Sequence, residues 1–446
     1  MNALVIPTLL ADEIRLLFSD APEESAGILF CHAAKGIETV KLLAAEFSAY
    51  SKEDYLVRSG DRIVIDPIAV NNRIQRARRD GLSMVQVHTH PLSEHAEFSN
   101  IDTLGEAEML PVICRRVPER HHGTLVLGKI SSSARIYSDE KAFSAARIIE
   151  VGTRIERLDK VAFQPKERYT RSYLALGRDE HASLQDLRVC IVGLGGLGSL
   201  VAEQLSYLGV KSVLMIDPDK LEESNLNRVA GALPEDVGKQ KVDVAADRYR
   251  AVMPSATVKA ISGSVLDESA ARAILDYDLT FCCTDSHGSR AVLNWISYQY
   301  LVPTIDTGVE ISLNNDMSIA AIAGRVQLIG PGMPCLHCCD TLDANRIRED
   351  LMTTEERERD QYVSGQRIHQ PAVITLNGVV ASLATTMLLG ISTGLPINAR
   401  MQTYDAIRGQ VRAAESTTKA GCPICSVDST IGGLGDAVTS IWRRAS

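Results

Sequence analysis

The stretch Arg188-Val-Cys-Ile-Val-Gly-Leu-Gly-Gly-Leu-Gly-Ser199 decides the fold of the second half of this chain. An apolar run of strand length leads directly into four glycines, and an apolar pattern of helical spacing then runs to Gly209. Strand, glycine turn and helix in this order let backbone N–H groups and the helix N-terminus approach the phosphates of a nucleotide. A sharp turn without a nucleotide would also favour glycine, so the residues that follow must decide. The four glycines are Gly193, Gly195, Gly196 and Gly198.

Composition sets the broad class of the protein. The chain has 446 residues, which predicts two or three domains, and its hydrophobic content of 45% and charged content of 23% are typical of a globular protein. The net charge of -9 argues against nucleic acid or an anionic membrane as a partner. The N-terminus lacks the basic and long apolar regions of a secretory signal, so a cytoplasmic protein is expected.

Polar residues beyond the glycines distinguish ATP chemistry from hydride transfer. A second strand, 212–217, ends in Asp217, and Asp219 follows closely. Asn225, Arg228 and Lys241 have the reach to contact phosphates. The buried run 281–285 ends in another acid, Asp285, and the two strand-end acids are suited to Mg²⁺ or to a ribose.

This pattern resembles the ThiF/MoeB/HesA family, the ubiquitin-activating-enzyme-like adenylyltransferases, over residues 168–426. The resemblance implies that the carboxylate of a C-terminal glycine attacks the α-phosphate of ATP, giving an acyl adenylate and pyrophosphate. It assigns phosphate contacts to the four glycines, ribose to Asp217 with Asp219 beside it, the triphosphate to Asn225, Arg228 and Lys241, and Mg²⁺ to Asp285.

The same resemblance implies a homodimer in which Arg171 reaches into the active site of the second subunit. Arg171, Arg228, Lys241 and Asp285 are accordingly the expected catalytic residues of this half. Val229 and Ser172 stand where the family usually has glutamine, but neither change removes a charge that the chemistry needs. A Rossmann-type domain that binds a nucleotide without catalysis is the alternative.

Two C-x-x-C pairs predict a structural zinc site. Cys335 and Cys338 form one pair and Cys422 and Cys425 the other, and four thiolates make the closed shell of a structural zinc. Their long separation is the spacing found in the adenylyltransferase family. Two unrelated redox or buried pairs would be the alternative.

The first third of the chain carries a histidine pair. His88 and His90 lie two apart on the expected strand 84–90, so both side chains point to one face, where two imidazoles can share a metal. With Asp102 they would make a shell of two histidines and one carboxylate, as is common for catalytic zinc. A His-x-His on a strand can also be two ordinary half-buried histidines.

The arrangement H-x-H-P, seven residues, S-x-x-D, with E-x-x-G upstream, resembles the JAMM (JAB/MPN) metalloprotease family. Members cleave isopeptide or peptide bonds after the C-terminal glycines of ubiquitin-like proteins. By this resemblance His88, His90 and Asp102 bind zinc, Glu24 takes a proton from the attacking water, and Ser99 helps to stabilise the oxyanion.

Three other segments carry structural expectations. Residues 142–158 are expected to form a helix, and the apolar run 372–392 a buried helix, with a subunit interface as one setting for it. Residues 340–366 are polar and expected to be mobile. That segment has no cysteine after Cys339 that could hold an activated carrier as a thioester, which favours an enzyme that stops at the adenylate or passes it to a thiol elsewhere.

The expected fold class is α/β: a JAMM-type α/β domain followed by a Rossmann-like, mostly parallel sheet with a four-cysteine zinc site. The expected domains are 1–145 and 168–446, with a helix and linker over 146–167. The chain is expected to be a bifunctional enzyme. One domain would use ATP and Mg²⁺ to adenylate the C-terminal glycine of a ubiquitin-like or sulfur-carrier protein, and the other would use a catalytic zinc ion to trim or deconjugate that C-terminus. Sulfur transfer and protein conjugation, through a downstream thiol acceptor or conjugating enzyme, both stay open. The alternative is a regulatory scaffold with inert sites.

Overall fold

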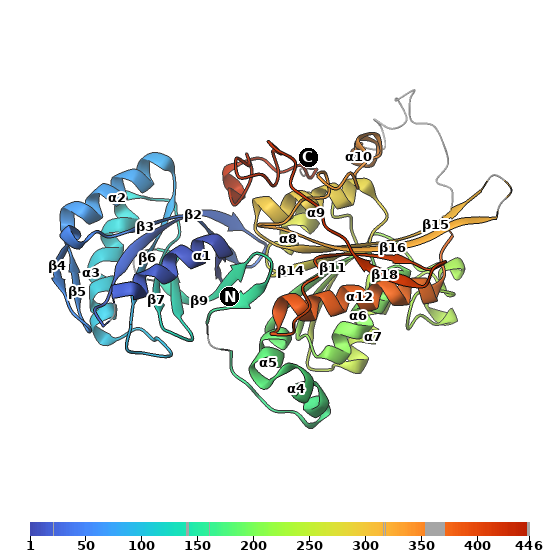
Figure 1. Cartoon of the computed structure of the whole chain (residues 1–446), viewed down its shortest axis with the longest axis horizontal. Helices are drawn as coiled ribbons and strands as arrows, with labels where there is room; N and C mark the ends of the chain where they lie inside the picture. The colour runs from blue at the N-terminus through green and yellow to red at the C-terminus, as the bar shows by residue number, and fades with distance from the viewer. Residues whose placement is uncertain are drawn as a thin grey trace. The chain divides into compact units, whose positions relative to one another are not determined.

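The computed structural model describes residues 1–20, 22–139, 142–159, 161–314, 316, 318–352 and 371–443. The chain forms two compact units. Unit 1 comprises Met1–Ala162, Gln299–Leu301 and Ile431–Thr439, and unit 2 comprises Phe163–Tyr298, Val302–Thr430 and Ser440–Ser446. Each unit has its own eight-stranded sheet, and Figure 1 labels the elements of both.

Unit 1 is built on a sheet in the order β1-β3-β2-β6-β7-β8-β9-β10, in which β1 also pairs with β9. Its strands are β1 (Ala3–Pro7), β2 (Ala26–Lys35), β3 (Val40–Ala49), β6 (Ser83–Thr89), β7 (His122–Leu127), β8 (Ser133–Tyr137), β9 (Phe143–Val151) and β10 (Ile155–Arg157), with β4 (Tyr55–Arg58) and β5 (Ile63–Ile65) as a separate pair. Its helices are α1 (Thr8–Arg15), α2 (Pro67–Asp80) and α3 (Asn100–Arg116).

Both faces of this sheet are covered, because alternate residues of its strands point to opposite sides. Leu29 of β2 packs in a cluster with Ile14 of α1, whereas its neighbour Phe30 packs in a second cluster with Ile74 of α2. Local signals fix α2 at both ends, since the Asp66 carboxylate accepts from the Ile68 amide at 2.7 Å and Gly81 ends the helix with φ 66°.

The helix expected over residues 142–158 is wrong, because this segment forms strands β9 and β10. The run Ala145-Ala-Arg147 favours a helix locally, but β9 lies between β8 and β1 in the sheet. Ile148 and Ile149 pair with β1 and are both buried, because the sheet is covered on both faces here. The strand therefore lacks the alternation of apolar and polar residues that would have identified it in the sequence.

Unit 2 has the Rossmann-like sheet order β13-β12-β11-β14-β15-β16-β17-β18, with parallel pairing from β13 to β15 and antiparallel pairing beyond. Its strands are β11 (Arg188–Val192), β12 (Ser212–Ile216), β13 (Thr257–Ile261), β14 (Leu279–Cys282), β15 (Thr304–Leu313), β16 (Ile319–Ile329), β17 (Met401–Asp405) and β18 (Gln410–Ala413). Its helices are α4 (Thr170–Leu176), α5 (Arg178–Asp186), α6 (Gly196–Leu208), α7 (Lys241–Val252), α8 (Glu268–Ile274), α9 (His287–Gln299), α10 (Ala344–Leu351) and α12 (Ile374–Ser392).

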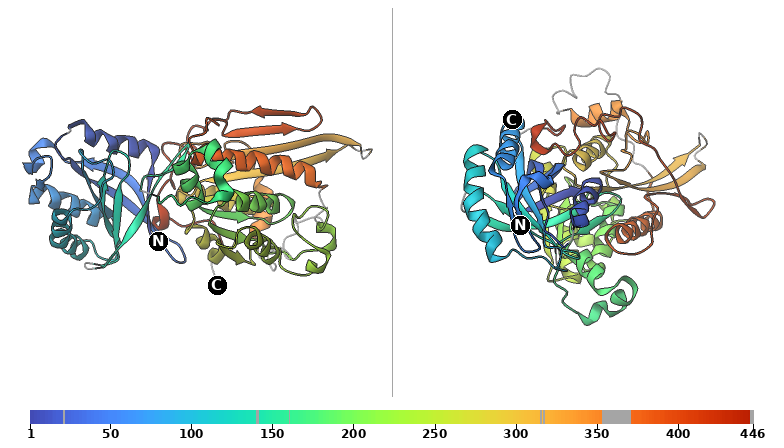
Figure 2. Two further views of the ribbon diagram at one scale, coloured as in Figure 1. Left: turned by 90° about the horizontal axis from the view of Figure 1, so that it is seen from below. Right: turned by 60° about the vertical axis from the view of Figure 1, so that its left-hand side comes forward.

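The expected apolar helix over residues 372–392 is α12. It lies beside α6, as Figures 1 and 2 show, and the Gln204 amide of α6 donates to the Ser382 hydroxyl of α12 at 3.0 Å. Length and composition would let α12 cross a membrane, but half of its most apolar window is buried inside the protein. Packing against α6, β15 and β16 accounts for the buried half of these apolar residues.

Replacing Leu29 by alanine tests the core of unit 1. The side chain is fully buried, so Leu29→Ala is expected to lower the opening free energy of β2 and β3 by about 2–5 kcal/mol through lost burial and a residual cavity. Amide hydrogen exchange of these strands measures the change. Leu9→Ala on α1, where the side chain is 85% exposed, is the matched control and should leave the exchange of both strands unchanged.

Candidate functional site

The glycine turn of unit 2 brings two stretches of backbone closer than any side chain would allow. Gly193 follows β11 with φ 91°, a conformation that favours glycine, and its amide donates to the Ile216 carbonyl at 2.9 Å. A Cβ at Gly198 would lie 1.8 Å from the Gly193 carbonyl oxygen. Any side chain at Gly198 would therefore force the first turn of α6 away from the end of β11.

Gly196 makes room for two long side chains. A Cβ there would lie 2.4 Å from Asn377 Nδ2 of α12 and 3.2 Å from Arg228 Cγ. The glycine spacing therefore serves packing as well as the approach of a phosphate. Asn377, which is 6% exposed, was not among the expected site residues, and its one sequence signal is an amide inside an apolar helix.

The Asp217 carboxylate holds the glycine turn in place. Its Oδ2 accepts from the Leu194 amide at 2.6 Å and its Oδ1 from the Asp219 amide at 2.8 Å. The side chain is buried, and burial raises the pKa of this carboxyl although both hydrogen bonds oppose the shift. Asp217 thus links the turns that follow β11 and β12, in addition to the ribose contact expected of it.

The expected phosphate-binding residues lie on the segment between β12 and α7 and contact their own neighbours. Lys241, at the start of α7, pairs with the exposed Asp219 carboxylate at 2.8 Å. Arg228 donates to the Ser224 carbonyl at 2.6 Å. Asn225 is buried, and its side-chain oxygen accepts from the Glu222 amide at 3.2 Å. The cationic side chains of Lys241 and Arg228 are therefore paired with exposed groups, the Asp219 carboxylate and the Ser224 carbonyl respectively.

Asp285 and Arg171 are both exposed. Asp285 lies on the turn between β14 and α9, at the carboxyl end of the parallel strands, where the glycine turn and Asp217 also lie. A Cβ at Gly193 would come within 2.7 Å of the Cys283 carbonyl oxygen, so the two turns are in direct contact. Arg171 is on α4, and the inter-subunit role expected of it stays a prediction.

In unit 1 the three expected zinc ligands converge. The ligand atoms of His88, His90 and Asp102 all lie within 4.8 Å of one another. The Asp102 oxygens are 3.1 Å from His88 Nε2 and 3.4 Å from His90 Nε2, and the two Nε2 atoms are 3.3 Å apart. Burial alone would raise the pKa of Asp102, but hydrogen bonds with both imidazoles outweigh it and hold this pKa far below its usual range. Two imidazoles and a carboxylate at such separations fit a zinc ion with an open position.

Glu24 lies at the edge of this group, with its Oε1 3.7 Å from His90 Nε2. Its burial raises the pKa of the carboxyl, against the opposing effect of the two imidazoles. The guanidinium of Arg58 donates to the Glu24 carbonyl at 2.9 Å and so fixes the backbone that carries this side chain. Its neighbour Glu23 is half exposed and lies 3.7 Å from Arg58, so the structure separates the two acids.

Ser99 begins α3 and is tied to Asp102 by a reciprocal cap. The Ser99 hydroxyl accepts from the Asp102 amide at 3.1 Å, and the Asp102 carboxylate accepts from the Ser99 amide at 2.6 Å. The hydroxyl proton is left to donate elsewhere. His95 is not part of the group, since its Nδ1 contacts the Ser131 hydroxyl at 2.8 Å.

The two C-x-x-C pairs of unit 2 meet as expected. All four sulfur atoms of Cys335, Cys338, Cys422 and Cys425 lie within 4.8 Å of one another. The sulfurs of Cys335 and Cys422 are 3.7 Å apart and those of Cys338 and Cys425 are 3.4 Å apart, close to the sulfur separation of a tetrahedron with Zn–S bonds of about 2.3 Å. The site therefore fits a structural zinc ion.

Cys339 lies outside this cluster, since its sulfur accepts from the Gln327 amide at 3.1 Å. Part of the segment expected to be mobile forms α10, whereas the rest of that expectation, over 353–366, lies outside the described residues. Asp350 of α10 contacts the start of α9, and the sequence offered no signal for this contact.

Comparison with known proteins agrees with the architecture of unit 2. Residues 169–424 match the model of the ThiF family. Molybdopterin-synthase adenylyltransferase of Escherichia coli (strain K12) is 28% identical over 260 residues, which cover 58% of this chain and 95% of that protein. Sulfur carrier protein adenylyltransferase of Thermus thermophilus is 27% identical over 266 residues, covering 59% and 92%. Ubiquitin-like modifier-activating enzyme 5 of Oryza sativa subsp. japonica is 28% identical over 174 residues, covering 36% and 39%. Because the family model spans more than half of the 446 residues, this chain belongs to the ThiF family.

Proposed function

We propose that unit 2 is an ATP-dependent adenylyltransferase that activates the C-terminal glycine of a small ubiquitin-like or sulfur-carrier protein. The observation that carries this proposal is the meeting of the glycine turn with the Asp285 turn at one edge of the sheet, in a chain of the ThiF family. The names of its relatives, which act on molybdopterin synthase, a sulfur carrier and a ubiquitin-like modifier, indicate this class of substrate.

In this proposal the residues of unit 2 bind and orient ATP for an in-line attack. The first-turn amides of α6 face the phosphates, and Arg228 and Lys241 give up their surface contacts to neutralise phosphate charge. The carrier carboxylate attacks the α-phosphorus, an acyl adenylate forms, and pyrophosphate leaves. Mg²⁺, when bound, would supply charge neutralisation, and Asp285 is the side chain that would hold it. A homodimer would add Arg171 of a second subunit.

We propose further that unit 1 is a zinc hydrolase of the JAMM type. His88, His90 and Asp102 would hold the ion, which supplies Lewis-acid chemistry when bound. Glu24, whose pKa is raised, would take a proton from the attacking water and pass it to the leaving amine. The free proton of the Ser99 hydroxyl would be donated to the oxyanion.

The two activities would act on the same flexible tail. A hydrolase that exposes a C-terminal glycine yields the carboxylate that the adenylyltransferase consumes, and one chain raises the effective concentration of this product. The placement of Cys339 against Gln327, rather than on an open surface, favours direct transfer of the adenylate to an external thiol or sulfide. A conjugation route would instead need a downstream enzyme with its own cysteine.

The purified chain is expected to hold about two zinc ions, one at each of the two ligand clusters. His88→Ala should lose the ion of unit 1 and Cys335→Ser that of unit 2, because each variant removes one ligand of its own cluster. Elemental analysis by mass spectrometry after desalting measures this. If one of these variants lost both ions, or if neither variant lost an ion, the result would contradict two separate zinc sites.

ATP–pyrophosphate exchange tests the adenylyltransferase, with a purified carrier ending in Gly-Gly. Asp285→Ala is expected to lower the exchange rate by about 10²–10³-fold, because Mg²⁺, which neutralises charge in the transition state, would lose its protein ligand. Asp247→Ala, at a side chain that is 81% exposed on α7, is the control and should keep the rate. No exchange by the unaltered chain across a panel of such carriers, with Mg²⁺ present, would exclude this function and favour the inert regulatory scaffold.

Cleavage of a carrier extended beyond Gly-Gly tests the hydrolase. Glu24→Gln should slow it by about 10²–10⁴-fold, since the glutamine keeps the shape but cannot accept the proton. Glu23→Gln is the matched control and should cleave normally. Chelation should abolish cleavage and added zinc restore it; cleavage that survives both Glu24→Gln and chelation would rule out the proposed site.

A further inference from the structure

The turn that carries Asp285 lies outside the regular helices and strands of unit 2. It spans residues 283–286 between the end of β14 and the start of α9, and Asp285 itself is exposed. A magnesium ligand must nevertheless hold its position relative to the phosphates, which lie at the neighbouring glycine turn in the proposed function. Side chains that fix this turn would therefore determine how well Asp285 can bind the ion.

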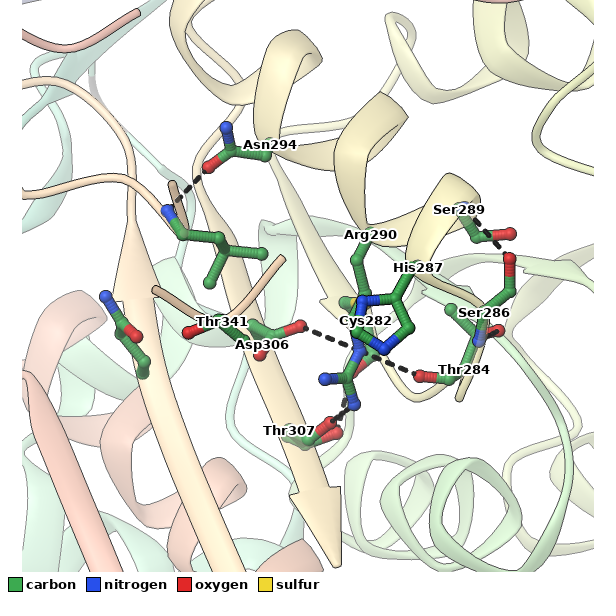
Figure 3. A network of polar contacts seen from close by, with 12 residues as sticks. Cys282, Thr284, Ser286, His287, Ser289, Arg290, Asn294, Asp306, Thr307 and Thr341 are labelled. Carbon is green, nitrogen blue, oxygen red and sulfur yellow. Dashed lines mark hydrogen bonds and ion pairs between the residues drawn. The ribbon is translucent and has the colours of Figure 1, made fainter. Parts of the chain in front are cut away.

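Arg290 fixes the turn from the buried side. From one helical turn into α9, its Nε donates to the Thr284 carbonyl at 3.2 Å, and a terminal nitrogen donates to the Thr307 carbonyl of β15 at 3.0 Å (Figure 3). Gly308 leaves the space for this group, because a Cβ there would lie 3.1 Å from the guanidinium. One planar fork thus joins the residue before Asp285 to the neighbouring strand.

The guanidinium of Arg290 also lies beside a buried carboxylate. Asp306 is completely buried, with one oxygen 3.7 Å from Arg290 Nε and the other paired with Arg325 of β16. Moving the Arg290 guanidinium away would leave the buried Asp306 charge less compensated, so this pair favours one orientation of the Arg290 side chain. Thr307 adds a further tie, since its hydroxyl donates to the Cys282 carbonyl at 2.6 Å.

Asp350 fixes the same turn from the other side. This residue of α10 accepts from the Ser286 hydroxyl at 2.8 Å and from the Gly288 amide at 3.0 Å, at the N-terminus of α9. Asp285 therefore lies between residues that are held from two directions, by a cation and by an anion that arrive from different elements (Figure 3 shows Ser286 and Arg290).

We infer that Arg290 and Asp350 are positioning residues for Asp285, which fix the turn 283–286 and the start of α9 so that Asp285 can bind the Mg²⁺ that accompanies ATP. This inference rests on the proposed adenylyltransferase function. Neither side chain needs to touch the nucleotide, because both act through the backbone on either side of Asp285.

Calorimetric titration of a non-hydrolysable ATP analogue at increasing Mg²⁺ concentration tests this inference without the carrier. Arg290→Lys keeps the charge beside Asp306 but loses the fork, and Asp350→Ala removes the outer tie. In each variant the Mg²⁺ concentration at half-saturation should rise about 10–100-fold. Binding of the analogue without Mg²⁺ should change little. Arg250→Lys, on the exposed side of α7, is the control and should match the unaltered chain.

A role in folding alone would leave the Mg²⁺ requirement of the soluble variants unchanged, and that result would overturn the inference. If Arg290→Lys is insoluble, Asp350→Ala decides, because Asp350 and the Ser286 side chain that it contacts are both only half-buried. Magnesium-dependent binding of the analogue by the unaltered chain, together with absent pyrophosphate exchange, would exclude the proposed reaction while still allowing the positioning role to be measured.

Discussion

The candidate nucleotide-binding edge of unit 2 depends on one close approach of backbone to backbone. The carbonyl of Gly193 lies where a Cβ of Gly198 would have to be, and the Asp217 carboxylate holds the intervening Leu194 amide. This pair of constraints sets the angle at which α6 leaves β11 and brings the Cys283 carbonyl against the same turn. The ends of three parallel strands are thereby placed in one small region, and the candidate chemistry of unit 2 follows from that placement.

Local signals were sufficient wherever a short stretch of sequence defines its own geometry. The strand–glycine–helix run and the strand that leads into the His-x-His pair both occur as predicted. The side chains of both candidate metal sites also converge, because they sit in short motifs whose spacing places two of them at a time. Strand β9 was missed because its neighbours in the sheet, rather than its own residues, determine its conformation.

The rest of the site depends on contacts between residues far apart in the chain. Asn377 behind Gly196, and Asp350 at the start of α9, come from elements whose positions no local pattern specifies. No local pattern specifies the partners of Arg290, because Asp306 and Thr307 become its neighbours only when β14 and β15 pair. The ligand types were therefore predictable, whereas the groups that orient them were not.

Asp102 has two roles at once, because it is a candidate metal ligand and also the partner that completes the cap of α3. Replacing it would remove a candidate ligand and loosen the first turn of that helix together, so the two effects could not be told apart. The Glu24 carboxylate caps no helix and instead lies beside the His90 imidazole. In a test of the proposed hydrolase, a chain meant to bind its substrate without cleaving it should therefore be altered at Glu24, where the capped start of α3 would stay in place.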